Sequence, residues 1–272
     1  GDSFIHVSNI DYIVETSHPI IELKQPKIGK VEKAIGKYCA SLIEDGSTLQ
    51  LGLGAIPDSV LLFLKDKKDL GIHSEMISDG VVELVKAGAI TNKKKTLHPG
   101  KIVVTLLMGT KKLYDFVNDN PMVEMYPVSY VNDPTVIMQN YKMVSINSCV
   151  QVDLMGQICS ESIGMKQISG VGGQIDFIRG TNMAQDGKSI IAIPSTAAKG
   201  RISRIVPFLD HGAAVTTSRN DASYVITEYG IARLKGKTLK QRAKELINIA
   251  HPDFREGLMK EYAARFNCKF EK

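Results

Sequence analysis

Apolar segments with two different periodicities alternate along the first half of this chain, and this alternation limits the folds open to it more than any other feature. Residues 31–43 place apolar side chains at helical spacing, whereas Leu49, Leu51 and Leu53 alternate as they would in a strand. Further strands are expected near 70–74 and 102–108, and further helices near 57–64, 81–87 and 111–117. Strands that alternate with helices are typical of an α/β protein with a largely parallel sheet.

The second half of the chain is less regular. Residues 143–154 and 157–162 flank the dipeptide Met155-Gly156, which predicts a β-hairpin. Strands are also expected at 189–193, 213–217 and 224–227, and two amphipathic helices within 239–266 close the chain. We therefore predict one α/β domain over residues 31–272, with an open, largely parallel sheet, flanking helices and a β-hairpin insertion. Residues 1–30, with a short strand near 10–14, are expected to be a lead-in.

Composition narrows the class of protein. Apolar residues make up 43% of the chain and charged residues 23%, which is an ordinary globular mixture. No apolar run approaches the roughly 18 residues of a membrane span, and no signal peptide is recognisable, so a soluble, cytoplasmic protein is expected. The net charge of +5 comes without aromatic residues interleaved among basic ones, so no nucleic-acid partner is expected. The four cysteines lack paired spacing, which predicts free thiols and no bound metal.

A glycine-rich turn separates an expected strand from an expected helix. It reads Gly52-Leu53-Gly54-Ala55-Ile56-Pro57-Asp58. Such a turn lets the backbone approach a ligand closely, and the N-terminus of the following helix favours negative charge. The dinucleotide-binding fingerprint requires a third glycine where Pro57 stands, which argues against a nicotinamide-dependent oxidoreductase. A plain strand-to-helix turn is the alternative.

Two further segments could supply a reactive group and an anion-binding loop. Glu75 follows an expected strand, and open α/β sheets bind ligands at the carboxyl ends of their strands. A surface glutamate is the alternative. In the run Ser169-Gly170-Val171-Gly172-Gly173-Gln174, three glycines in four positions offer backbone N–H groups to an anion or an oxyanion. A flexible loop would explain them as well.

Two later segments could line a binding site. Residues 194–204 combine small hydroxyl side chains with Lys199, Arg201 and Arg204, which suit a phosphate or a carboxylate. Glu228 lies at the end of an expected strand, just before a glycine turn. It could support a site or simply end the strand.

Taken together, these segments resemble those of CoA transferases of the acetyl-CoA hydrolase/4-hydroxybutyrate CoA-transferase family. The resembling stretches are Gly52–Asp58, Gly71–Glu75, Gly170–Phe177, Ser195–Gly200, Thr227–Ala232 and Ala250–Arg255. Each is modest alone, but six in the same order are specific. Members of the family are longer and have a related α/β domain before this one. The resemblance therefore implies that the chain is a C-terminal part, and that the missing N-terminal domain of the same protein is its partner.

The resemblance also implies a mechanism. Glu75 would be the nucleophile that attacks an acyl-CoA thioester, and a glutamyl-CoA thioester would then form in a ping-pong reaction. Backbone N–H groups near Gly54 and Gly172 would stabilise the tetrahedral oxyanion. Contacts to CoA or substrate are expected from Gly52, Ala55, Ile56, Asn147, Gly170, Gly173, Gln174, Lys199 and Glu228. Coenzyme A would be a co-substrate, with no permanently bound cofactor.

The expected activity is transfer of CoA from acetyl-CoA, butyryl-CoA or 4-hydroxybutyryl-CoA to a free short-chain carboxylate. Two alternatives stay open. The same glutamyl intermediate could be attacked by water, which would make the protein an acetyl-CoA hydrolase, or the isolated domain could be inactive and bind CoA only weakly. The sequence leaves the acceptor acid open, and a homodimer is one of the assemblies that it allows.

Overall fold

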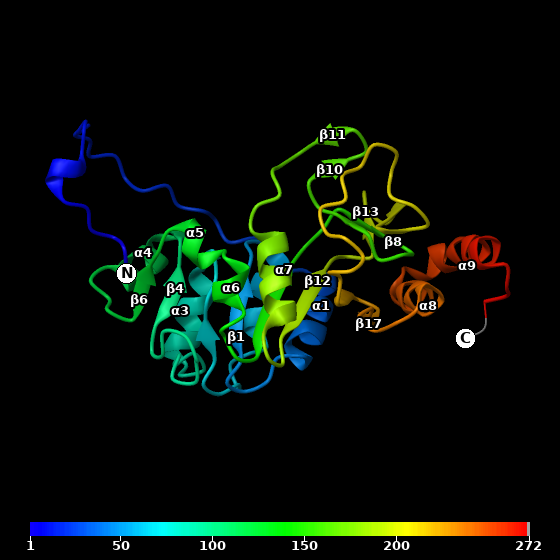
Figure 1. The fold of residues 1–272 in the computed structure, drawn as a ribbon, viewed down its shortest axis with the longest axis horizontal. Coiled ribbons are helices and arrows are strands. Elements are labelled where there is room, and N and C mark those ends of the chain that lie inside the picture. Colours follow the sequence, from blue (N-terminus) through cyan, green and yellow to red (C-terminus); the bar gives the residue numbers. More distant parts are fainter. Residues whose placement is uncertain (271–272) are drawn as a thin grey trace.

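The structure is a computed structural model that describes residues 1–270. At its centre is a six-stranded sheet with the order β17-β16-β12-β7-β1-β2 (Figure 1). The strands are β1 Thr48–Leu51, β2 Gly71–Ile72, β7 Met143–Asn147, β12 Lys188–Ala192, β16 Tyr224–Thr227 and β17 Gly230–Arg233. Neighbouring strands are parallel except β16 and β17, which are antiparallel. The predicted open, largely parallel α/β sheet is therefore confirmed.

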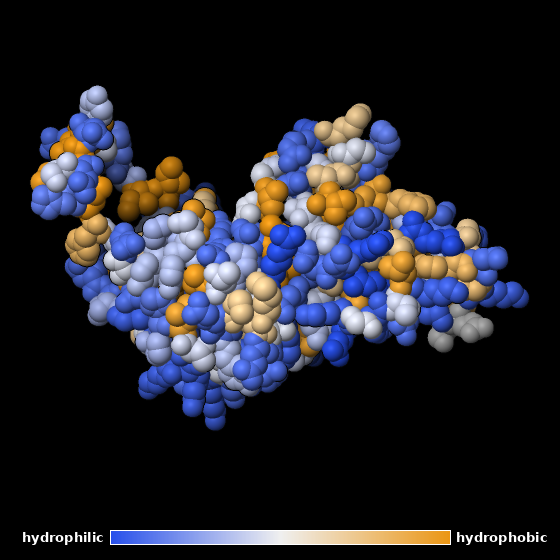
Figure 2. Space-filling model, viewed as in Figure 1, coloured by the Kyte–Doolittle hydropathy of each residue, from blue (hydrophilic) through white to orange (hydrophobic). Residues whose placement is uncertain are grey.

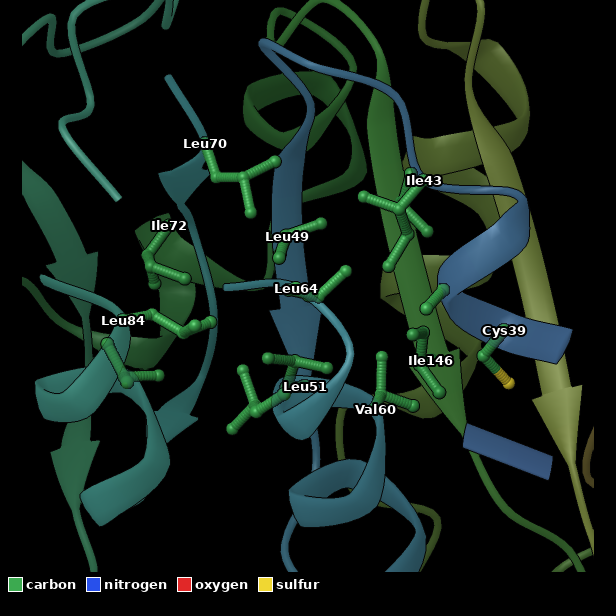
Figure 3. Packing of buried hydrophobic residues seen from close by; sticks show 14 of the residues in the cluster. Cys39, Ile43, Leu49, Leu51, Val60, Leu64, Leu70, Ile72, Leu84 and Ile146 are labelled. Carbon is green, nitrogen blue, oxygen red and sulfur yellow. The ribbon is translucent and has the colours of Figure 1, made fainter. Parts of the chain in front are cut away.

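The central strands are buried on both faces, as expected for a parallel sheet covered by helices. In β12, Ile190 and Ala192 belong to the core cluster that contains Cys39 of α1 (Lys30–Ser41), whereas Ile191 belongs to the cluster that contains Ile178 of α7 (Gln174–Met183). Alternate residues of a strand point to opposite faces, so α1 and α7 cover the two faces of the sheet. Figure 3 shows the first of these cores from close by.

The remaining helices lie around this sheet. They are α2 Ala55–Leu62, α3 Asp79–Lys86, α4 Lys111–Val117, α5 Val128–Val131, α6 Pro134–Ile137, α8 Leu239–Ile249 and α9 Pro252–Phe266. The helices predicted near 31–43, 57–64, 81–87 and 111–117 are confirmed as α1 to α4. Pro57 lies in the first turn of α2, where its missing N–H would have no partner in the helix.

Two short parallel pairs continue the structure beyond β2. They are β3 Met76–Ile77 with β5 Leu106–Leu107, and β4 Ile102–Val104 with β6 Val123–Met125. The single strand predicted over 102–108 is therefore two strands that part at Thr105. The break has a clear cause, because the N–H groups of Thr105 and Leu106 both donate to the Glu75 carbonyl, at 3.0 and 2.9 Å.

A small β lobe is built mainly from chain between β7 and β16, on one side of the sheet (Figure 1). Its strands are β8 Gln151–Asp153, β9 Ile158–Cys159, β10 Ser162–Ile163, β11 Lys166–Gln167, β13 Thr196–Ala197, β14 Ile202–Ser203 and β15 Ile205–Val206. The predicted hairpin is confirmed for β8 and β9, which turn at Gly156 with φ +85°. Residues 143–147 are not part of it, because they form the central strand β7. The strand predicted over 213–217 is wrong, since Thr217 makes only one bridge, to Ile158.

Residues 1–29 form an extended arm that leaves the body of the molecule and returns to it (Figure 1). The strand predicted near 10–14 is wrong, because the arm has only the 3-10 turn η1 (Val7–Asn9) and no strand neighbour among the described residues. Figure 2 shows a hollow between this arm and the small lobe, with apolar side chains on both sides. In the part of the chain described, no helix is long and apolar enough to cross a membrane.

Candidate active site

Glu75 lies at the carboxyl end of β2, where parallel α/β sheets bind their ligands. The strand itself ends at Ile72, and His73 and Ser74 still pair with Val103 of β4. Glu75 then lies in a bend, with its carbonyl held by the two N–H groups of the β4–β5 break. The backbone of Glu75 is thus fixed from both sides, while its half-buried side chain reaches the surface.

The side chain of Asn132 orients the Glu75 carboxylate. Its Nδ2 donates to Glu75 Oε2 at 2.8 Å. Asn132 directly follows α5, and its own N–H donates to the Val128 carbonyl at 2.9 Å. Among the described residues, no hydrogen bond is made to Glu75 Oε1. One carboxylate oxygen is therefore anchored and the other is left free to react.

The glycine loop lies against the same carboxylate oxygen. A Cβ atom on Gly173 would lie 2.3 Å from Glu75 Oε2 and 2.5 Å from Asn132 Nδ2, so only glycine leaves room for this pair. Gly172 has φ +60°, a conformation that favours glycine. Gly173 is also the N-cap of α7, and it offers no side chain to the free N–H groups of the first helical turn. These N–H groups and the helix dipole favour negative charge next to Glu75.

These elements line an open pocket of about 380 Å³. Its lining residues come from the end of β2, from α5 and the turn after it, and from the start of α7: Glu75, Val128, Ser129, Asn132, Asp133, Gly172, Gly173 and Asp176. Burial raises the pKa of Asp176. The positive charge of Arg179 lowers this pKa in part, and the negative charges of Glu75 and Asp133 raise it further. Three carboxylates thus lie around one small opening.

The sequence had singled out Glu75, Gly172 and Gly173, and the structure brings these three residues together. Gly170 is exposed in the same loop, with open space around its Cα. Asn132 and Asp176 were not among the site residues predicted from the sequence. The only signal for Asn132 was the sequence Asn132-Asp133-Pro134, which is typical of a turn.

The turn that contains Gly54 lies against another pocket. Gly54 has φ +122° and is the N-cap of α2, which fits a strand-to-helix turn. It lines a pocket of about 250 Å³ together with Leu53, Asp58 and residues 23–26 of the returning arm. Gly52 and Ala55 are half-buried beside it, and Ile56 belongs to the core.

Three predicted contact residues, Asn147, Gln174 and Glu228, have other partners in this structure, and a fourth, Lys199, is exposed. Asn147, at the end of β7, exchanges hydrogen bonds with Gln50 of β1, at 3.1 and 3.3 Å. Gln174 donates to the hydroxyls of Ser160 and Thr217, and so ties α7 to the small lobe.

Glu228 and Lys199 each lie on a turn. The Glu228 carboxylate accepts from the N–H and the hydroxyl of buried Ser195, at 2.8 and 2.6 Å. Lys199 is exposed, with φ +59°. Among the described residues, no group of three or more His, Cys, Asp or Glu side chains could hold a metal ion.

Comparison with known proteins identifies the family. The model of the acetyl-CoA hydrolase/transferase C-terminal domain matches residues 109–262. This chain belongs to the acetyl-CoA hydrolase/transferase family. Glu75 lies before the matched residues, but within the longer similarity to individual members of the family.

Two curated relatives and one solved structure describe that similarity. The 4-hydroxybutyrate coenzyme A transferase of Clostridium kluyveri is 78% identical over 98% of this chain and 62% of its own length. The succinyl-CoA:cyclohexane-1-carboxylate CoA transferase of Geobacter metallireducens is 54% identical over 98% of this chain and 61% of its own length. The crystal structure of a 4-hydroxybutyrate CoA-transferase from Porphyromonas gingivalis has a TM-score of 0.86 and 53% identity, covering 96% of this chain and 62% of that one. The chain thus spans about three fifths of the length of these family members.

Proposed function

We propose that this chain is the C-terminal part of a CoA transferase that moves CoA between a short-chain acyl-CoA and a free carboxylate, with Glu75 as the nucleophile. The observation that carries the proposal is the placement of the Glu75 carboxylate. One oxygen is held by Asn132, the other has no hydrogen bond from any described residue, and the carboxylate lies beside Gly173, the N-cap of α7, in an open pocket. The relatives named as 4-hydroxybutyrate, cyclohexane-1-carboxylate and butyrate CoA transferases support a carboxylic acid as the acceptor.

The reaction begins with attack of Glu75 Oε1 on the thioester carbonyl. The C–S bond breaks, CoA leaves as the thiolate, and an acyl-glutamyl anhydride remains. The thiolate then attacks the Glu75 carbonyl of the anhydride, which releases the first acid as a carboxylate and leaves a glutamyl-CoA thioester. A second carboxylate repeats these steps in reverse, so Glu75 and its free carboxylate are regenerated. The thioester free energy is kept throughout because no water is consumed.

Each step passes through a tetrahedral oxyanion, which needs donors that are already in place. The N–H groups at Gly172 and at the start of α7 are suited to this task, and we assign the same role to Gly54, which lines a different pocket in this chain. One such donor typically contributes about 3 kcal/mol. The residues proposed to hold CoA or the acyl group are Gly52, Ala55, Ile56, Asn147, Gly170, Gly173, Gln174, Lys199 and Glu228. A preceding domain of the same protein would complete the pocket on the side of the hollow between arm and lobe.

The proposal is tested by trapping the intermediate. The full-length protein is incubated with acetyl-CoA, reduced with sodium borohydride and mapped by mass spectrometry. Reduction of a glutamyl thioester to an alcohol lowers the mass of one residue by about 14 Da, and we expect this change at Glu75. The Glu75→Gln variant is the control and should stay unmarked.

Each other outcome has a definite meaning. A mark on Glu228 or Glu161 would keep the reaction class and remove Glu75 as the nucleophile. If acetyl-CoA is consumed with no mark on any residue, direct hydrolysis replaces the transferase. CoA binding without any turnover would mean that the protein is inactive.

A further inference from the structure

His73 lies two residues before Glu75, and its ring is buried completely. Its Nε2 lies 2.9 Å from the Val131 carbonyl oxygen. Because a carbonyl can only accept, Nε2 carries the proton and donates. The ring is therefore held as one tautomer. Its Nδ1 is left as a buried acceptor with no partner among the described residues.

The carbonyl that accepts the His73 hydrogen bond lies at the end of a short helix. Val131 is the last residue of α5, which is only four residues long. The last carbonyls of a helix have no partner within the helix and must find one elsewhere. The residue that follows is Asn132, whose side chain donates to the Glu75 carboxylate. The bond from His73 therefore fixes the end of α5 from which the Asn132 side chain extends.

These contacts form a closed circuit. It runs from the His73 ring to the Val131 carbonyl, along the chain to Asn132, across to Glu75 Oε2, and back along the backbone to His73. The other side of the ring faces Phe177 of α7, with ring centroids 6.2 Å apart. His73 thus touches both elements, α5 and α7, that flank the carboxylate.

The charge state of the ring agrees with this arrangement. Burial lowers the pKa of His73 to about 4, against the bond to Val131, and the charges of Lys95 and His98 lower it further. At neutral pH the ring is uncharged, so it donates to Val131 without placing a positive charge behind the nucleophile.

We propose that His73 is a positioning residue for the Glu75 carboxylate, acting through the Val131 carbonyl and the Asn132 side chain. This inference rests on the proposed function, in which Glu75 is the nucleophile. A residue that only filled the core would not need a ring nitrogen left without a partner, because burying an unsatisfied polar atom costs free energy. The hydrogen-bond donor at position 73 is explained by the Val131 carbonyl, which it holds in place next to Asn132.

The test compares three kinds of variant in the full-length protein. His73→Leu removes the donor, and His73→Met does so with a more adaptable side chain in case the first variant does not fold. His73→Gln keeps an N–H at a reach similar to that of Nε2. Asn140→Leu is the matched control, because Asn140 is also fully buried and donates to Ile137, the last residue of the four-residue helix α6.

The readouts are the rate of borohydride-trapped labelling at Glu75, kcat, the KM for acetyl-CoA, and the thermal midpoint. Misplacement of a reacting group by about 1 Å can lower a rate by about 100-fold. We therefore expect His73→Leu and His73→Met to slow labelling and kcat by about 10- to 100-fold, with KM little changed. His73→Gln should recover most of this rate. Asn140→Leu should lower the thermal midpoint and keep the labelling rate of the wild type.

The inference fails if a folded variant without the donor is labelled at the wild-type rate. It also fails if Asn140→Leu slows labelling as much, since the effect would then be one of stability, or if folded His73→Gln stays as slow as His73→Leu. An unlabelled wild type would instead refute the proposed function, and this inference with it.

Discussion

Replacement of Gly173 by alanine should disable Glu75, the proposed nucleophile, without unfolding the protein. The backbone of Gly173 has φ −83° and ψ 5°, in the bridge region that residues other than glycine also occupy, so alanine meets no left-handed conformation there. The added Cβ, however, would lie 2.3 Å from Glu75 Oε2 and 2.5 Å from Asn132 Nδ2. Ordinary contact begins near 3.4 Å, so the carboxylate must move by about 1 Å or lose its bond to Asn132.

A shift of this size has a predictable effect on rate. Misplacement of a reacting group by about 1 Å lowers the rate by about 100-fold, which corresponds to about 2.7 kcal/mol in the activation free energy. Stability should change little, because alanine restricts the unfolded chain more than glycine does and offsets part of the local repulsion, an effect of about 0.4–1 kcal/mol.

The assay is the rate of borohydride-trapped labelling at Glu75, measured beside urea unfolding of the same samples. Gly257→Ala is the control, because nothing lies within 4 Å of a Cβ there, its φ is outside the left-handed region, and Gly257 lies in α9, outside the proposed site. We expect Gly257→Ala to label at nearly the wild-type rate and Gly173→Ala to label about 100 times more slowly. Wild-type labelling by a folded Gly173→Ala protein would refute the claim that this glycine makes room for the carboxylate.

Three further predictions concern parts of the molecule around the site. Burial lowers the pKa of Lys95 to about 7, so the folded protein binds fewer protons than the unfolded chain between pH 7 and pH 10.5, and stability should rise with pH across that window. Urea unfolding at pH 7 and pH 9 should show a rise on the order of 1 kcal/mol per pH unit that is absent in Lys95→Met. Gly36→Ala would place a Cβ 2.8 Å from the Ser59 carbonyl carbon where α1 crosses α2; it should cost about 1–3 kcal/mol of unfolding free energy and leave Glu75 labelling unchanged. Glu228→Ala removes the acceptor of both Ser195 bonds and should raise the KM for acetyl-CoA several-fold, whereas unchanged kinetics would mean that the Ser195 turn does not contact CoA.

The fold could be predicted from the sequence wherever a segment carries its own periodicity. The helices α1 to α4 and the buried strands β1, β12 and β16 show their spacing within the segment itself. The strand predicted over 213–217 is rich in small and β-branched residues, but a strand exists only where a partner lies beside it, and here only Thr217 finds one. The break at Thr105 could not be predicted either, because it depends on the Glu75 carbonyl thirty residues earlier.

The candidate site also combines residues that a local sequence pattern predicts with residues whose place depends on packing. The positions of Glu75 and the glycine loop could be inferred because a carboxylate after a strand and three glycines in four positions are local signals. Asn132 was missed, since an asparagine in a turn is ordinary until packing places it against Glu75. His73 was expected on the same strand face as Glu75, but its bond to Val131 could not be predicted because it depends on packing. Side-chain bonds of Gln174 and Asn147 were equally hidden, because their partners Thr217 and Gln50 lie far away in the sequence.

The arrangement around Glu75 also answers a difficulty of carboxylate catalysis. A helix N-terminus that stabilises the tetrahedral oxyanion stabilises the resting carboxylate as well, and only the difference between the two accelerates the reaction. The structure separates the two tasks, because Asn132 holds Oε2 while Oε1 has no hydrogen-bond partner among the described residues. In the proposed reaction Oε1 is the attacking atom, and its charge is thus less well satisfied in the ground state than the charge on Oε2. Donors at Gly172 and at the start of α7 can then act mainly on the charge that develops during the reaction, which is the condition for a net gain in rate.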